Sequence, residues 1–506
     1  MHHYCAGYCK TPAAWQELSC RLARYSDEWL VFQPEKNWFK IDRETGLFIF
    51  GSSIGDKLHH IHSRHHFDNQ TWTVVGGFPT FEKFAQFPPG RSMDIADWVS
   101  QLRQQHPHEN LFESLGLAGG GWNISEVNVA QRNITAYGAP SGLCGMFYIN
   151  NPSYFAVSNK PAILGALQND GPYTEIDKQF LLWQVALASV VGYRTMWKQV
   201  RRIRPCDYIH FDLNSTKIEI NPFPNSPFIP QPCAEADENE IILSGADEMA
   251  DSLRWLLNCG FDIVADLTGG KDSRLILAAL TGCGLSERIS HFETRGSISH
   301  GDRIVAQLLA NKAGLKNWRP LDYHDNLVDD TIEAHLPRFT QTVRHYDYFC
   351  SAWDSMLPHE LSAPSRYHRL IGHSGDLFRQ LAPPKDPLGV YCEDDFINWG
   401  TTFDQLGLLL HETAANLQQE IRESIFEQFL TENTINMGLR NQIGAWDNSR
   451  ATNNPQRFTP LANLTLMRLA NSKPNAYETI HYKLMRAFNP VVLEVPFLNQ
   501  TWNGPD

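Results

Sequence analysis

The sequence predicts an α/β protein with two structural halves, and three observations support this fold class. Strand-like segments and turns dominate the N-terminal half, strands alternate with helices after residue 260, and helical patterns dominate past residue 400. A proline-rich stretch separates the two halves. We therefore expect an N-terminal domain over residues 1–220, a linker over 221–239 and a C-terminal domain over 240–506, because 506 residues allow two or three domains of roughly 150 residues.

The N-terminal half contains two segments typical of β-hairpins. Residues 38–50 place two β-prone runs around a turn, and residues 148–157 repeat the pattern with Asn-Asn-Pro-Ser as the turn. Strands with glycine-rich turns recur up to Asn159, and a helix is expected near residues 176–191. The five prolines within residues 222–232 then exclude a regular helix or a central strand.

The C-terminal half alternates between short apolar runs and helical patterns. An apolar run at residues 261–267 precedes a helical pattern at 274–280, and a second run at 289–294 precedes another helical pattern at 302–313. This spacing predicts a parallel sheet. A long helical pattern at residues 403–429 predicts a helical C-terminal region.

The composition excludes several classes of protein. Lysine and arginine number 43 against 56 acidic residues, so the net charge is −13 and a basic surface for nucleic acid or anionic membranes is not expected. The most apolar stretch, residues 180–192, is shorter than the roughly 20 residues of a membrane span. The ten scattered cysteines match neither a zinc ribbon nor a disulfide framework, and no secretion signal is visible. We expect a cytoplasmic protein that binds neither nucleic acid nor membranes.

The strongest chemical signal is the segment DLTGGKDSR at residues 266–274, where a predicted strand ends and a helix begins. Gly269 and Gly270 allow a ligand to approach the backbone closely. The N-terminus of the helix presents N–H groups to an anion, and Thr268 and Ser273 add hydroxyl donors. Although a Gly-Gly turn alone is often only a turn, this combination predicts a pyrophosphate site.

Two charged residues within this segment differ in expected role. The carboxylate of Asp272 would repel a phosphate, but a Mg²⁺ ion between them makes the pairing favourable. The segment lacks the Walker A spacing, so Lys271 is expected to be a solvated surface lysine.

Residues 268–273 resemble the S-G-G-x-D-S pyrophosphate loop of the asparagine synthetase-like ATP pyrophosphatases, with Thr268 in place of the first serine and Arg274 following. Residues 371–377 (IGHSGDL), about a hundred positions later, resemble the second loop of that family, which brings an acid to the same Mg²⁺. The alternative for Asp376 is an ordinary turn acid. Weaker similarity extends over residues 155–160, 195–205, 457–461 and 483–486.

The resemblance implies a fold, an activity and a set of ligands. The expected fold is an N-terminal Ntn-hydrolase-like β-sandwich followed by an adenine-nucleotide α-hydrolase-like parallel sheet with a helical C-terminal region. The family adenylates a carboxylate with ATP, releases pyrophosphate and lets an amine displace AMP. Asp272 and Asp376 would hold Mg²⁺. The residues expected to bind ATP are Leu267, Thr268, Gly269, Gly270, Asp272, Ser273, Phe292, Gly372, Ser374 and Gly375.

One departure from the family concerns the glutamine-hydrolysing half. Glutamine-dependent members use a cysteine at position 2, whereas this sequence has His2, and the nearby Cys5 and Cys9 are internal. We therefore expect no glutaminase activity and an amine already carried by a substrate, as in β-lactam synthetases and lasso-peptide cyclases. A small-molecule or peptide substrate, with a precursor peptide and its processing protease as partners, follows from that branch.

A second departure is the missing lysine near the C-terminus, which in the family stabilises charge on the adenylate and pyrophosphate. Lys483 and Lys473 are candidates to replace it, although either can be a surface lysine, and Tyr348 is a candidate base. Two alternative functions remain open, namely ammonia- or glutamine-dependent amidation of a small acid and non-catalytic nucleotide binding.

Two further features have structural interpretations that we prefer. A cluster of five histidines is expected to form a solvated loop or an interaction surface rather than a metal site: His59, His60, His62, His65 and His66. Asp302 follows the second predicted strand and is expected to be a helix N-cap, with a ligand role as the alternative.

Overall fold

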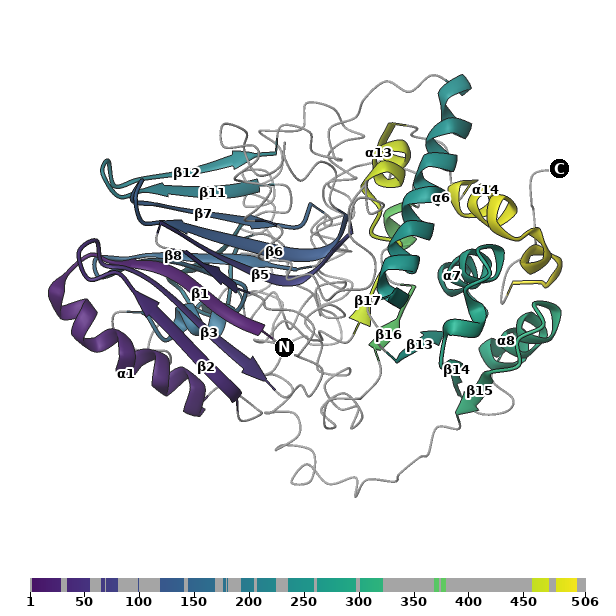
Figure 1. Ribbon diagram of the computed structural model, residues 1–506, viewed down its shortest axis with the longest axis horizontal. Coiled ribbons are helices and arrows are strands. Elements are labelled where there is room, and N and C mark those ends of the chain that lie inside the picture. Colours follow the sequence, from purple (N-terminus) through teal and green to yellow (C-terminus); the bar gives the residue numbers. More distant parts are fainter. Residues whose placement is uncertain are drawn as a thin grey trace, which may run out of the picture.

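The chain folds into a β-sandwich and a parallel sheet with associated helices (Figure 1). The computed structural model describes residues 2–28, 34–54, 65–68, 70–80, 99, 119–140, 144–168, 176–178, 180, 193–203, 207–223, 235–258, 262–296, 301–321, 368–372, 375–378, 457–472 and 479–497.

The sandwich consists of two six-stranded antiparallel sheets. The first has the strand order β10 (Val200–Ile203), β8 (Met146–Asn150), β9 (Tyr154–Ser158), β1 (His2–Cys9), β3 (Leu47–Ile54) and β2 (Pro34–Ile41). The second has the order β12 (Lys217–Pro222), β11 (Asp207–Asp212), β7 (Asn133–Gly138), β6 (Gly119–Asn128), β5 (Thr71–Thr80) and β4 (His65–Phe67). Both predicted hairpins are confirmed as the pairs β2–β3 and β8–β9.

Alternation along the strands divides the apolar side chains between two layers. In β3, Leu47 and Ile49 face the second sheet, whereas Phe48 and Phe50 face the helices on the outer side. Phe155 of β9 stacks on Phe211 of β11 across the sandwich, with ring centroids 4.1 Å apart. Among the described residues, the outer layer includes α1 (Pro12–Glu28) and α4 (Pro161–Gly165).

The C-terminal lobe is built on a five-stranded parallel sheet, which confirms the predicted α/β class. Its strand order is β15 (Trp318–Leu321), β14 (His291–Arg295), β13 (Ile263–Asp266), β16 (His368–Leu370) and β17 (Arg457–Phe458). The helices of this lobe that lie within the described residues are α6 (Glu235–Asn258), α7 (Lys271–Gly282), α8 (Gly301–Lys312), α13 (Leu464–Ser472) and α14 (Thr479–Phe488). The described part of the lobe also contains the 3-10 helices η3 (Ser286–Arg288), η5 (Gly375–Phe378) and η9 (Pro490–Glu494).

Some predicted boundaries differ from those observed. Strand β12 extends to Pro222 and α6 begins at Glu235, so both enter the stretch predicted as a linker over 221–239. Of the helix predicted near residues 176–191, Ile176 forms an isolated bridge with Trp197, whereas Lys178 and Phe180 are helical. Residues 181–192 and 403–429 lie outside the described residues. No helix of the described part is long and apolar enough to span a bilayer.

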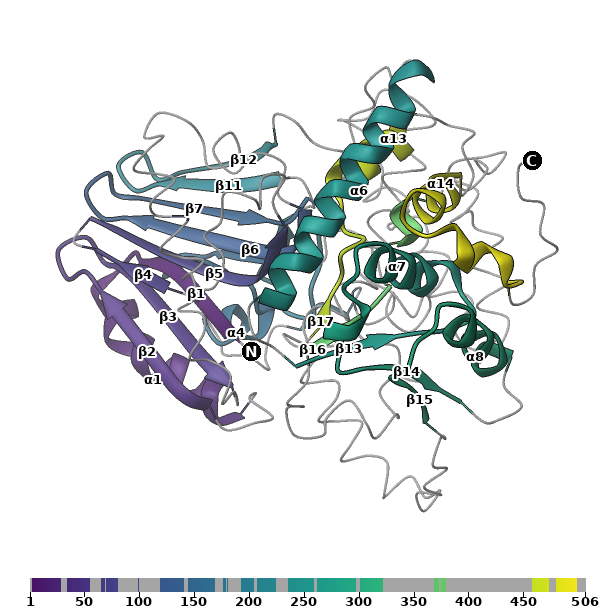
Figure 2. The same ribbon diagram turned by 45° about the vertical axis from the view of Figure 1, so that its right-hand side comes forward.

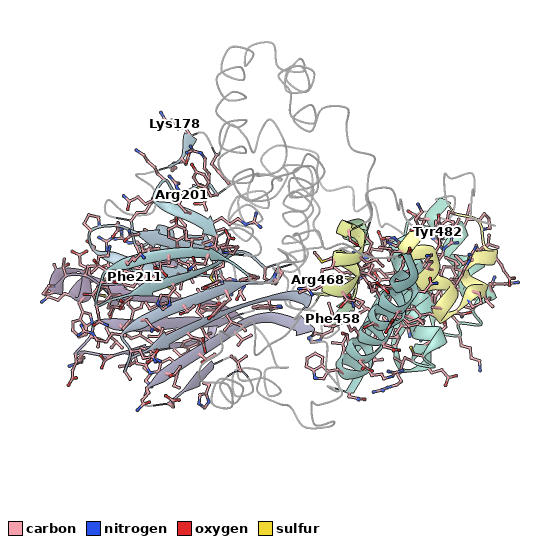
Figure 3. The ribbon with its side chains drawn as sticks, turned by 90° about the horizontal axis from the view of Figure 1, so that it is seen from above. Lys178, Arg201, Phe211, Phe458, Arg468 and Tyr482 are labelled. Carbon is pink, nitrogen blue, oxygen red and sulfur yellow. The ribbon has the colours of Figure 1, made fainter. Side chains whose placement is uncertain are left out.

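The two lobes share one hydrophobic core, with α6 between the sandwich and α7 (Figures 1 and 2). Trp122 and Ile124 of β6 belong to the same buried cluster as Met249 and Leu253 of α6. The Gly120 N–H also donates to the Ala462 carbonyl at 2.7 Å. Figure 3 shows the sandwich around Phe211 and the C-terminal lobe around Phe458 and Tyr482.

Trp122→Ala should therefore destabilise the whole chain, because the indole is fully buried where the lobes meet. We expect a loss of about 3–5 kcal/mol in the free energy of unfolding, measured by urea denaturation. Phe39→Ala, which removes a ring that is 44% exposed on β2, is the matched control and should cost much less. Equal losses in the two variants would contradict a shared core.

Candidate functional site

The first glycine-rich turn connects the carboxyl end of β13 to the N-terminus of α7. Gly270 is the N-cap of α7, with an extended backbone (φ −76°, ψ 171°) and no side-chain cap. A Cβ added at Gly270 would contact only the Thr268 hydroxyl within 4 Å, at 3.3 Å. The turn thus presents the helix N-terminus without a capping side chain, which is the geometry that favours an anion.

Hydroxyl groups within the turn hold it closed. The Thr268 N–H donates to Ser273 Oγ at 3.0 Å, and the two hydroxyl oxygens lie 2.9 Å apart. The Gly270 N–H donates to Thr268 Oγ1 at 3.2 Å. The hydroxyls predicted to contact phosphate therefore also fix the shape of the turn.

The carboxylate of Asp302, at the start of α8, also belongs to this site. Its Oδ1 accepts a hydrogen bond from the Gly269 N–H at 2.8 Å. The sequence predicted only an N-cap, with a ligand role as the alternative, because the partner lies 33 residues away. This charge-assisted hydrogen bond fixes the orientation of the Gly269 peptide in the turn.

The second glycine-containing turn follows β16 and packs against Asp272. A Cβ added at Gly372 would lie 2.8 Å from Asp272 Cβ, and one added at Gly375 would lie 2.1 Å from Asp272 Oδ1. The two turns predicted to converge therefore meet at Asp272. Asp376 lies in η5, but its side chain, like Ser374 and Tyr348, lies outside the described residues.

His481 of α14 is a site residue that the sequence analysis missed. It is completely buried, and its Nε2 lies 2.9 Å from Asp272 Oδ1. The ring packs on Phe378 of η5, with centroids 5.6 Å apart. Within the described part of the chain, Nδ1 of His481 has no hydrogen-bond partner. A histidine on the apolar side of an amphipathic helix was the available signal, but its partner is 209 residues away.

Lys483 and Lys271 lie in environments that differ from those expected for a catalytic lysine and a solvated lysine. Lys483, the predicted catalytic lysine, forms an ion pair with Glu238 of α6 at 2.5 Å, so its ammonium is drawn to the α6 side of α14. Lys271 was predicted to be solvated, but this is wrong, because it is only 6% exposed. Its ammonium lies 5.8 Å from the centroid of the Tyr482 ring.

Two of the residues expected to bind ATP, Leu267 directly after β13 and Phe292 in the neighbouring strand β14, have buried side chains. The side chains of Leu267 and Phe292 are buried in the core of the C-terminal lobe. The Leu267 N–H donates to the Glu293 carbonyl at 2.9 Å, and Thr294 Oγ1 donates to the Leu267 carbonyl at 2.6 Å. The carboxyl ends of β13 and β14 are thereby fixed side by side, at the edge where parallel sheets bind ligands.

A charged network occupies the same end of the sheet. The guanidinium of Arg369 on β16 donates to Asp266 on β13 and to Glu293 on β14, the latter at 3.1 Å. Burial alone raises the pKa of Glu293, but the hydrogen bond from Arg295 and the charge of Arg369 outweigh it and leave this pKa below its ordinary value. Glu293 therefore stays ionised at neutral pH and ties three strands together through Arg369.

Cys5 and Cys9 of β1 are buried between the first sheet and α1. Burial raises the pKa of the Cys9 thiol to about 12, and it raises the pKa of Cys5 well above its ordinary value. Both side chains are therefore thiols at neutral pH, whereas a nucleophile must be a thiolate.

Of the predicted histidine cluster, His65 and His66 lie in β4, and the remaining three histidines lie outside the described residues. Over the part of the chain that the structure describes, no group of three or more His, Cys, Asp or Glu side chains could hold a metal ion.

Comparisons with known proteins give only distant similarities. No family model and no curated protein matches the sequence. The chain is similar to a solved structure of an allosteric regulatory enzyme of purine biosynthesis, with a TM-score of 0.29 and 10% identity over 53% of this chain and 60% of that one, which is less than two thirds of its length. It is also similar to glutamine phosphoribosylpyrophosphate amidotransferase from B. subtilis complexed with ADP and GMP, with a TM-score of 0.29 and 9% identity over 74% of this chain and 81% of that one.

The buried thiols predict a pattern of chemical modification. Iodoacetamide at pH 7.5 should alkylate Cys20, which is exposed on α1, and leave Cys5 and Cys9 unmodified until the protein is unfolded. Because their pKa values are raised, the thiolate fraction of Cys5 and Cys9 should remain small even at pH 9. Peptide mass spectrometry measures this, and rapid alkylation of native Cys5 would contradict the buried environment.

Proposed function

We propose that the chain is an ATP- and Mg²⁺-dependent, AMP-forming amide ligase of the asparagine synthetase-like type. In this proposal, a substrate carboxylate attacks the α-phosphate of ATP, pyrophosphate leaves, and an amine then displaces AMP to form an amide. The observation that carries the proposal is the meeting of two glycine-containing turns, 268–273 and 372–375, at the carboxylate of Asp272. Each turn follows a strand of the parallel sheet, and those strands, β13 and β16, are neighbours.

The donors available around Asp272 suit Mg²⁺ with phosphate. Mg²⁺ is typically bound by one or two carboxylates plus substrate phosphates, and it does not require a cage of protein ligands. Asp272 supplies one carboxylate, and Asp376 would supply the second from the next turn. The first turn of α7 supplies N–H groups for the phosphates. When bound, Mg²⁺ would neutralise charge on the phosphate oxygens of ATP.

The remaining residues of the site have positioning roles in this proposal. His481 holds one oxygen of Asp272 at 2.9 Å and so fixes the orientation of the carboxylate. Thr268 and Ser273 keep the turn closed, and Asp302 aligns the Gly269 N–H. Catalysis would consist mainly of aligning the carboxylate with the α-phosphate and stabilising the charge that develops on the leaving pyrophosphate.

The amine is proposed to be carried by the substrate itself. The buried thiols of Cys5 and Cys9 are poorly suited to hydrolyse glutamine, so ammonia released by either of them is not the expected nucleophile. Ring closure within a peptide or a small molecule, as in lasso-peptide or β-lactam formation, fits this requirement. A precursor peptide and its processing protease would then be the partners.

A second candidate is nucleotide binding without turnover. It is favoured by the ion pair between Lys483 and Glu238, which holds the candidate catalytic lysine on the α6 side of α14. Pyrophosphate release from ATP, measured over a panel of free and peptidic carboxylic acids, separates the two candidates. Tight ATP binding with no acid-dependent pyrophosphate would favour the second candidate, and glutamate released from added glutamine would point to a working glutaminase.

Asp272→Asn should lower ATP–pyrophosphate exchange by at least about 100-fold, because the amide removes the charge that balances the metal. The matched control is Asp251→Asn, an aspartate paired with Arg254 on the exposed surface of α6, which should leave exchange unchanged. Circular dichroism should show both variants folded. Activity of Asp272→Asn within about tenfold of the unmodified protein would argue strongly against the metal role.

Gly375→Ala tests whether the close approach of the turns matters for activity. The new Cβ would lie 2.1 Å from Asp272 Oδ1, so the turn or the carboxylate must move, and we expect exchange to fall by roughly 10- to 100-fold. Gly138→Ala is the control, because its Cβ would meet no atom closer than 3.6 Å. Full activity in Gly375→Ala, with its stability intact, would show that this contact is dispensable.

A further inference from the structure

Arg274, the residue directly after the first glycine-rich turn, is completely buried. Its Nη1 donates to the carbonyls of Val492 and Val495 at 3.2 and 2.5 Å, and its Nη2 donates to the Pro496 carbonyl at 3.0 Å. The guanidinium also lies 3.6 Å from the centroid of the Phe497 ring. A single side chain of α7 therefore binds the segment of residues 490–497 through three carbonyls and one ring.

This contact lies one turn from the donors of the candidate pyrophosphate site. Lys271, three residues earlier on α7, faces Tyr482, and the rings of Tyr482 and Phe497 meet edge to face with centroids 5.8 Å apart. Asp272, which lies between Lys271 and Arg274 on α7, is in hydrogen-bond contact with His481. The first turn of α7 is thus held by α14 and by residues 490–497 together.

Burying the guanidinium of Arg274 costs desolvation free energy, but it gives directional hydrogen bonds. Burial lowers the pKa of Arg274 to about 10, which still leaves the guanidinium protonated at neutral pH. Its Nε has no hydrogen-bond partner among the residues that the structure describes. An aliphatic side chain would fill this space with less desolvation, but it could not fix the direction of three carbonyls. The arrangement therefore favours precise placement of the segment on α7 over stability.

We infer that Arg274 is a positioning residue that couples residues 490–497 to the first turn of α7 and thereby keeps the N–H donors of the pyrophosphate site aligned. This inference rests on the proposed function for its effect on ATP. The structural coupling itself, between the two segments, is independent of that function.

The test uses the full chain with three substitutions. Arg274→Met keeps the length of the side chain and removes every donor, Arg274→Lys keeps a charge and fewer donors, and Arg288→Met removes an exposed arginine that bonds Asn258. KM for ATP and kcat are measured by ATP–pyrophosphate exchange, and amide hydrogen exchange is measured for residues 268–275 and 490–497.

Arg274→Met should raise KM for ATP by roughly tenfold or more with a smaller change in kcat, and it should speed amide exchange in both segments. Arg274→Lys should recover part of each effect, and Arg288→Met should match the unmodified protein. If Arg274→Met does not fold, Phe497→Leu, which removes only the ring, should shift KM and exchange in the same direction.

An unchanged KM in Arg274→Met would overturn the inference even if the melting temperature falls, because packing alone would explain that loss. Absence of ATP turnover in the unmodified protein would instead count against the proposed function. In that case hydrogen exchange decides the matter, and unaltered exchange at residues 268–275 in Arg274→Met would overturn the coupling.

Discussion

The close approach of the second turn to Asp272 is the constraint on which the candidate site depends. Gly372 and Gly375 leave no room for a Cβ beside this carboxylate, so the backbone of one turn forms the wall of the other. Such contact requires the two turns to leave neighbouring parallel strands at the same edge of the sheet, which β13 and β16 achieve. His481 reaches Asp272 from α14, so three segments that are distant in the sequence fix one acid.

The rest of the fold explains why this edge can be rigid. Arg369 ties the ends of three strands through Asp266 and Glu293, and the lowered pKa of Glu293 keeps that network ionised at neutral pH. Helix α6 packs on both the β-sandwich and α7, so α7 rests on a core shared by the two lobes. The β-sandwich shares this core with the C-terminal lobe and buries the side chains of Cys5 and Cys9 on its other side.

Local patterns predicted much of this fold. The hairpin at 38–50, the apolar run that became β13 and the helix that became α7 follow from alternation, turn residues and periodicity, which are properties of neighbouring residues. The residues whose environments differ from the prediction owe their positions to packing between segments that are distant in the sequence. Lys271 looked solvated in the sequence, but α14 covers it through Tyr482, and Asp302 looked like an ordinary cap, but it reaches Gly269. His481 stood out locally only as a histidine on the apolar side of an amphipathic helix, and its partner Asp272 is 209 residues away, so only the folded chain brings the two together.

The most direct test of the central claim is the position of a metal ion. Crystals grown with Mn²⁺ in place of Mg²⁺ and a non-hydrolysable ATP analogue allow the metal to be located by anomalous scattering. We expect a peak within about 2.5 Å of an Asp272 carboxylate oxygen, beside Gly372 and Gly375 and in contact with the phosphates. An analogue bound elsewhere, or a metal peak with no contact to Asp272, would contradict it.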